Sequence, residues 1–322
     1  NAVSSIFDFS GMKPKPGDVP MHFPRGGFTA LLFAARGGFT ECAKILLDHG
    51  ADVKAADPDG TSALVLAIIN GHYDTAAFLL DRKADPNAAD SNGRAALFAA
   101  IDMRDIYSSN RPAPRDSNKV DPMDLIKMLL DRGADPNAKL SKMIVPRAVL
   151  DFPDVMMGEG ATPFLRAAKS ADIPLMQLLL DKGADPKVVT KAGVTALMVA
   201  AGMGHANTIR RGEQPVEAMK ICLDKGVDIN AATDKTLNTA LHAAAGQGTD
   251  DIVQFLADHG AKLDLKDNKG RTPRDVALGL QADAVGVEVH QSTADLLGKL
   301  MGLPATTTAA ALPAENHPAS AR

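Results

Sequence analysis

Residues 28–60 read FTALLFAARGGFTECAKILLDHGADVKAADPDG, and this stretch decides the fold. A short apolar segment opens at Thr29 and closes at a glycine pair, which predicts a first helix. A second segment, from Thr40 to Gly50, carries apolar residues at helical spacing and predicts a second helix. Asp-Pro and Asp-Gly pairs follow, and they cannot continue a helix, so residues 52–60 predict an extended loop with a turn.

Two sequence motifs of this stretch recur along the chain at a fixed spacing: the apolar segment of the first helix and the GADVK segment that follows the second helix. Leu31, Leu64 and Leu97 are spaced 33 residues apart, and so are Phe164 and Leu197. Copies of the second phrase, GADVK or GADPN, open at Gly50, Lys83, Gly133, Gly183, Gly226 and Gly260. A fixed period of this length marks an array of similar units. Because neither helix is long enough to be stable alone, each unit must bury its apolar stripe against the next.

This pattern resembles the ankyrin repeat family, whose signature pairs a Thr-Pro-Leu-His phrase with a later Gly-Ala-Asp-Val/Pro-Asn phrase. Thr162-Pro163 and Thr272-Pro273 match the first half of the signature, and TALH at residues 239–242 matches with Ala for Pro. The resemblance implies an all-α solenoid of about seven units, each with two antiparallel helices and a β-hairpin loop. It also implies a protein that binds other macromolecules.

The resemblance divides the chain into three parts. Residues 1–26 are expected to be an irregular lead-in, similar to the hairpin of a preceding unit, so we expect at least one further repeat before Asn1. Residues 27–301 are the predicted repeat domain, and the Ala-, Thr- and Pro-rich residues 302–322 are expected to be a disordered tail. The repeat sequences are also similar to those of bacterial ankyrin arrays, many of which are exported. A periplasmic or extracellular location is therefore slightly favoured over a cytoplasmic one.

Insertions interrupt the repeat at four places: about residues 102–122, 141–160, 204–215 and 280–291. The first and third fall between paired helices, which places them at the same end of the stack, two units or on the order of 20 Å apart. One partner could therefore touch both. The insertion at 141–160 falls in a loop, on the concave side.

The insertion from Asp102 to Pro122 mixes charged residues with three prolines. Proline restricts the backbone and leaves such a loop partly ordered. Four of its residues are of the types that anchor interfaces, and we take them as candidate partner contacts: Arg104, Tyr107, Arg111 and Arg115. The alternative is a solvated loop that touches nothing.

The insertion at 141–160 is apolar instead, and its candidate partner contacts are Met143, Ile144, Phe152, Met156 and Met157. Fully burying one large apolar side chain gains roughly 1.5–3 kcal/mol, so this loop is not expected to lie fully in water. Either it folds back onto its own repeats, with part of it still exposed, or it presents an apolar patch to a partner.

Charged residues at the loop tips change sign along the chain. Asp57 and Asp59 make the first tip acidic, whereas Lys191 and later lysines make the following tips basic. The resulting weak dipole would orient a partner along the concave face. The alternative is a solvated face without a partner.

Composition and motifs argue against other functions. The net charge of −4 does not indicate the basic surface that nucleic-acid binding needs, and no apolar run is long enough to span a membrane. Cys42 and Cys222 lie in helical patterns and are predicted to be core residues. The histidines show no metal-ligand spacing, and no nucleophile or phosphate-binding motif occurs, so no metal, cofactor or catalytic residue is predicted.

Two further positions are predicted to be structural. Arg274 stands where earlier units place leucine, which indicates the capping unit at the end of a stack. Aspartates at one repeat position are predicted to start the loops: Asp52, Asp85, Asp135, Asp185 and Asp228.

The sequence therefore predicts a non-catalytic scaffold, expected to be a monomer, that binds a protein partner on the concave face. The alternative is an accessory or targeting region of a larger enzyme or exported complex, with the catalytic part outside this chain.

Overall fold

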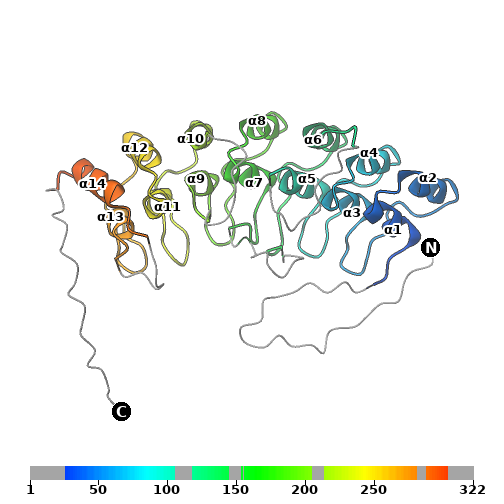
Figure 1. Cartoon of the computed structure of the whole chain (residues 1–322), viewed down its shortest axis with the longest axis horizontal. Coiled ribbons are helices and arrows are strands. Elements are labelled where there is room, and N and C mark those ends of the chain that lie inside the picture. The colour runs from blue at the N-terminus through cyan, green and yellow to red at the C-terminus, as the bar shows by residue number, and fades with distance from the viewer. Residues whose placement is uncertain are drawn as a thin grey trace, which may run out of the picture.

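The computed structural model of the chain describes residues 26–105, 118–144, 154, 156–204, 214–280 and 288–303. Within this part of the chain every regular element is a helix, and the helices form seven consecutive pairs. Figure 1 shows that the pairs stack side by side in a curved row, from α1 and α2 at one end to α13 and α14 at the other. The fold is therefore an all-α solenoid, as the repeat predicts.

One helix of each pair belongs to an inner row, which lies beside the loops (Figure 1). The inner row consists of α1 (Ala30–Gly37), α3 (Ala63–Ile69), α5 (Ala96–Asp105), α7 (Pro163–Lys169), α9 (Ala196–Ala200), α11 (Ala240–Gln247) and α13 (Pro273–Ala277). The outer row, on the convex side, consists of α2 (Thr40–Asp48), α4 (Tyr73–Asp81), α6 (Pro122–Asp131), α8 (Ile173–Asp181), α10 (Pro215–Asp224), α12 (Asp250–Asp258) and α14 (Gln291–Leu300). Successive inner helices contact one another, so neighbouring pairs share one apolar interior.

A hydroxyl side chain caps the start of most inner helices. Thr29 Oγ1 accepts a hydrogen bond from the backbone N–H of Leu32, and Thr162 Oγ1 accepts one from Leu165. The same bond occurs at Ser62, Thr195, Thr239 and Thr272. Because the first N–H groups of a helix have no partner within the helix, the recurring Thr or Ser fixes where these six inner helices begin.

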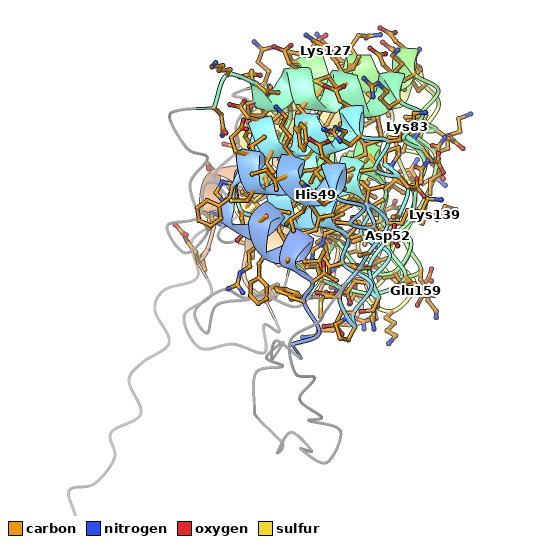
Figure 2. The ribbon with its side chains drawn as sticks, turned by 90° about the vertical axis from the view of Figure 1, so that its right-hand side faces the viewer. His49, Asp52, Lys83, Lys127, Lys139 and Glu159 are labelled. Atoms are coloured by element: carbon orange, nitrogen blue, oxygen red, sulfur yellow. The ribbon has the colours of Figure 1, made fainter. Side chains whose placement is uncertain are left out.

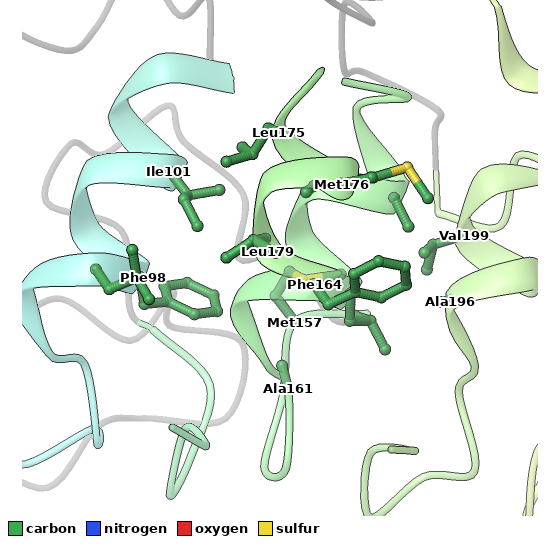
Figure 3. Packing of buried hydrophobic residues seen from close by; sticks show 14 of the residues in the cluster. Phe98, Ile101, Met157, Ala161, Phe164, Leu175, Met176, Leu179, Ala196 and Val199 are labelled. Carbon is green, nitrogen blue, oxygen red and sulfur yellow. The ribbon is translucent and has the colours of Figure 1, made fainter. Parts of the chain in front are cut away.

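The residues that recur every 33 positions form the centre of the interior. Each of these residues exposes at most 1% of its surface: Leu31, Leu64, Leu97, Phe164, Leu197 and Leu241. Figure 3 shows Phe164 of α7 near Met176 of α8 and Val199 of α9, which belong to the same buried cluster. The period of the sequence is thus the period of the core.

An aspartate starts each of five loops, as predicted. Asp52 Oδ1 accepts a hydrogen bond from the N–H of Lys54 at 2.8 Å. Equivalent bonds are made by Asp85, Asp135, Asp185 and Asp228. The resemblance implies β-hairpin loops, and backbone hydrogen bonds do cross the described loops, as from the N–H of Asp57 to Thr61 O and from the N–H of Asp90 to Arg94 O. The described residues form no regular strand. Side-chain turns and these backbone bonds together shape the loops.

Asparagine side chains join successive loops. Asn137 Nδ2 donates to the carbonyl of Gly183 at 2.9 Å, and Asn137 Oδ1 accepts from the N–H of Asp185 at 2.7 Å. The same two kinds of bond reach the next unit from Asn87 and Asn230. The final residue of the GADPN motif therefore links units, a role that the repeat pattern alone does not reveal.

Lysine replaces this asparagine at Lys54 and Lys187. We expect Asn137→Ala to lower the free energy of unfolding by about 1–2 kcal/mol, because two hydrogen bonds between units are lost. Lys187→Asn is expected to raise it by about 1 kcal/mol, because Gly226 and Asp228 offer the equivalent backbone groups in the next unit. Urea unfolding at pH 7 measures both changes. Shifts of the two variants in the same direction would contradict the proposed link.

The two ends of the described stack differ. In the last described pair, Arg274 Nε donates to the carbonyl of Ala294 in α14 at 3.2 Å, so this arginine contacts the outer helix of its own pair. In the first pair, Phe39 and Ile45 are each 58% exposed. Cys42 is exposed on the same helix, so its predicted burial is wrong. The reason is that no described unit packs against this side of α2.

Candidate functional site

The loops form one edge of the molecule, away from the outer helices. In Figure 2, which looks along the stack, Lys139 and Glu159 lie on the loop side, whereas Lys127 lies on the outer helix α6. Two large apolar loop residues, Val189 and Leu237, are 48% and 43% exposed. Neither could be identified from the sequence, because a single apolar residue in a loop gives no periodic signal.

Lys191 lies on this loop edge, where its Nζ is 2.8 Å from Glu159 Oε2 and its side chain is 73% exposed. Lys235 and Lys266, on the next two loops, are also exposed. Exposed ion pairs contribute only about 0–1 kcal/mol, so Lys191 can exchange Glu159 for another acidic group. Its position is compatible with the predicted partner contact.

Asp57, by contrast, is built into its own loop. Asp57 Oδ1 accepts hydrogen bonds from the N–H groups of Asp59 at 3.0 Å and Thr61 at 2.7 Å. Asp90 makes the same arrangement in the next loop. The carbonyl of Asp59 accepts from the N–H of Ser91, which joins these two loops. The Asp57 carboxylate therefore shapes the turn, which argues for a structural role rather than the predicted partner contact.

Arg104 lies within the fold rather than on the surface of an insertion. Its Nε is 2.7 Å from Asp172 Oδ2, and both side chains are largely buried. Asp172 also caps α8, because its Oδ1 accepts from the N–H of Leu175. The guanidinium thus ties the third pair to the fourth, which corrects the expectation of a partner anchor. The other candidates Tyr107, Arg111, Arg115 and Phe152 lie outside the described residues.

The base of the insertion at 141–160 is closed by backbone hydrogen bonds. The N–H of Leu140 donates to Ala161 O at 2.9 Å, and the N–H of Gly160 donates to Leu140 O at 2.8 Å. Bonds to the flanking loops run from the N–H of Ser141 to Asn92 O and from the N–H of Lys191 to Glu159 O. The loop edge therefore continues beneath the insertion.

The described apolar residues of this insertion fold back, which confirms that part of the expectation. Met157 is buried in the core, and Ile144 and Met156 are half-buried against it (Figure 3 labels Met157). Met143 is half-buried as well. Met157 is consequently a core residue rather than a partner contact.

Asp154 and residues 156–160, here termed the return segment, reach back from the loop edge to the inner helices. Asp154 Oδ2 lies 2.6 Å from Nζ of Lys169, the last residue of α7. Met156 lies against Gly204, beyond α9, where a Cβ atom would collide with it. Burial lowers the pKa of Lys169 from its ordinary 10.5, and the charge of Asp154 opposes this shift. The return segment therefore covers the C-terminal end of α7.

A second ion pair lies nearby, between α5 and α7. Arg166 Nε is 3.0 Å from Asp102 Oδ1, and an Arg166 terminal nitrogen donates to Ser170 Oγ at 2.6 Å. All three residues are buried. The neighbouring inner helices α5 and α7 are thus joined by an ion pair at this point.

The remaining candidate chemical groups have structural partners. His72 Nε2 lies 3.0 Å from Arg36 O, and His49 Nδ1 lies 2.8 Å from Ile45 O. Burial raises the pKa of the Cys222 thiol to about 12, which is typical of a core residue, as predicted. In the described ranges, no three His, Cys, Asp or Glu side chains are grouped as metal ligands. None of the described helices has the length and apolar character needed to cross a bilayer.

His242 links the sixth pair to the seventh. Its Nδ1 lies 2.9 Å from Thr239 Oγ1 within the helix cap, and its Nε2 lies 3.1 Å from Arg271 O. Burial lowers the pKa of His242 below its ordinary 6.5, although the bond to the Arg271 carbonyl opposes the shift. The folded protein therefore favours the neutral imidazole.

This shift predicts a loss of stability in acid. Below about pH 6.5 the unfolded chain binds a proton at His242, whereas the folded chain resists protonation there. The contribution of neutral His242 to the free energy of unfolding is therefore complete above that pH and is lost as the pH falls. Against His242→Gln, we expect the wild-type unfolding free energy to fall more steeply below pH 6.5, by up to about 1.4 kcal/mol per pH unit. Urea unfolding from pH 7.5 to 5 measures the slopes, and equal slopes would contradict the assignment.

Stacked helix pairs with an exposed loop edge define the class of helical repeat proteins. A profile of the family described as ankyrin repeats, in three copies, matches residues 13–90, 117–211 and 210–285. The chain belongs to the ankyrin repeat family.

Comparisons with individual proteins agree with this assignment. The Neurogenic locus Notch protein of Drosophila melanogaster is 38% identical over 100 residues, which is 30% of this chain but 4% of that protein. This chain therefore spans only a small part of that relative's length. The ankyrin repeat domain of human ASB11 superposes with a TM-score of 0.57 at 22% sequence identity. The match covers 86% of this chain and 100% of the ASB11 chain. A third similar fold comes from the complex of the endopeptidase Bd0816 of Bdellovibrio bacteriovorus with the immunity protein Bd3460. One chain of that complex has a TM-score of 0.51 at 22% sequence identity, and the match covers 72% of this chain and 98% of that one.

Proposed function

We propose that this chain is a non-catalytic scaffold that binds a protein partner across its loop edge and the concave face of its inner helices. The observation that carries the proposal is the exposed loop edge, where Val189 and Leu237 stand among the lysines Lys191, Lys235 and Lys266. Apolar groups beside exposed charge are suited to a protein surface that carries both kinds of group. Membership of a family of interaction modules supports the same function, as does a fold neighbour taken from a protein complex.

Charge reversal on two faces tests the proposal. The loop variant carries Lys191→Glu, Lys235→Glu and Lys266→Glu, and the control carries Lys44→Glu, Lys127→Glu and Lys220→Glu on the outer helices. All six lysines are exposed, so the two variants change the net charge equally.

Wild type is first used to capture a partner from its native source, and each purified variant is then titrated with that partner. We expect the loop variant to bind at least tenfold more weakly and the control to bind within about twofold of wild type. Loss of binding by the outer-helix control alone would place the partner on the convex face and contradict the proposal.

A further inference from the structure

Lys169 is the last residue of α7, in the inner row of helices. At the equivalent position of other units Arg36 and Gly246 are exposed, whereas Ile69 and Asp102 are buried. Lys169 is buried as well, with only 2% of its side chain exposed. An ammonium group is thus withdrawn from water, which requires a cover and a negative partner.

The return segment provides both. Asp154 supplies the carboxylate, 2.6 Å from Lys169 Nζ. Met156, two residues after Asp154, supplies the cover and lies against Gly204. Met157 continues into the core. An acidic residue followed at the second and third positions by large apolar residues therefore fills the space beside α7 and α9.

The neighbouring cation is already engaged. Arg166 faces Asp102 and Ser170, so its charge is directed along the inner row rather than toward the return segment. Lys169 is consequently the group whose charge Asp154 meets. The Asp154 side chain is 33% exposed, so the carboxylate side of this pair is open to water while the lysine is covered.

We propose that Lys169, Gly204 and the adjoining core form a seat for a partner segment in which an acidic residue is followed two and three residues later by large apolar side chains. The return segment occupies this seat in the free chain and is displaced by the partner. This inference rests on the proposed function, because it specifies the chemistry recognised on the same concave face.

The test uses a fluorescein-labelled peptide with the sequence of residues 154–160, Asp-Val-Met-Met-Gly-Glu-Gly. Fluorescence anisotropy measures its binding to the full chain and to a vacated chain with Asp154→Gly, Val155→Ser, Met156→Gly and Met157→Ser. We expect the vacated chain to bind at least tenfold more tightly than wild type, because its seat is empty. Addition of Lys169→Met, or Asn in place of Asp in the peptide, is expected to abolish this gain, whereas addition of Lys127→Met on the outer helix is expected to preserve it.

Circular dichroism and urea unfolding establish that each variant is folded. If the vacated chain does not fold, the pair Asp154→Asn and Met156→Ser replaces it with the same expected outcomes, since Met157 then remains in the core. Equal binding of the peptide by wild type and the folded, vacated chain overturns the inference, and so does a gain that survives Lys169→Met. A captured partner that binds wild type and Lys169→Met equally well would also overturn it, while leaving the proposed function intact.

Discussion

Arg166→Met is expected to lower the free energy of unfolding by about 3–5 kcal/mol, because it removes the cation that faces the buried carboxylate of Asp102. The guanidinium lies 3.0 Å from that carboxylate and also donates to Ser170, so one substitution disturbs two contacts between buried groups. Buried charges tolerate the loss of a partner poorly, since water cannot replace it.

Urea unfolding at pH 7 measures this effect against a matched control. Lys182→Met removes the cation of an exposed pair with Asp131, which joins neighbouring units on the outer row, and is expected to cost about 0–1 kcal/mol. Adding Asp102→Leu to Arg166→Met is expected to restore at least half of the loss, because an apolar pair then replaces the buried carboxylate. Similar costs for Arg166→Met and Lys182→Met would show that burial does not govern the pair.

Phe164→Ala is expected to lower the free energy of unfolding by about 3–5 kcal/mol, because it leaves a cavity in the middle of the stack. Phe164 is 1% exposed and lies in the core that α7 shares with α8 and α9. Since each unit contacts only its neighbours, a weak central unit also uncouples the two halves. We therefore expect unfolding of this variant in two steps instead of one.

Phe39→Ala, at the residue directly before α2, is the matched control, because it removes the same ring from an exposed position, and its expected effect is within about 0.5 kcal/mol. Fluorescence from single tryptophans placed in the first and last units distinguishes one transition from two. A single cooperative transition in Phe164→Ala would show that the halves remain coupled across the cavity.

The fold could be predicted from the sequence because each copy of the repeat supports the others. Leu31, Leu64 and Leu97 mark the same core position at the same spacing, and their burial confirms the period. The hairpin loops that the resemblance implies are turns closed by backbone hydrogen bonds, such as that from the N–H of Asp57 to Thr61 O, and the described residues form no regular strand there. The expected burial of Cys42 failed because a helical stripe is buried only where another unit covers it.

The candidate site could be predicted only in part, because its contacts join distant residues. Arg104 and Asp172 are 68 residues apart, and insertions of irregular length separate them, so no spacing rule pairs them. A basic residue beside a proline-rich insertion has the sequence character of an exposed residue. The link between Asp154 and Lys169 likewise depends on the path of one insertion, which the repeat does not specify.

The hydrogen bonds at Leu140, Gly160 and Ala161 hold the two ends of an insertion together while the layers on both sides keep their register. Doubling the length of a closed loop costs only about 0.6 kcal/mol of chain entropy. Descendants of this chain can therefore exchange one insert for another of different length and composition while the rest of the scaffold stays constant. That junction is a natural grafting point, where an insert of new composition is accommodated without a new fold.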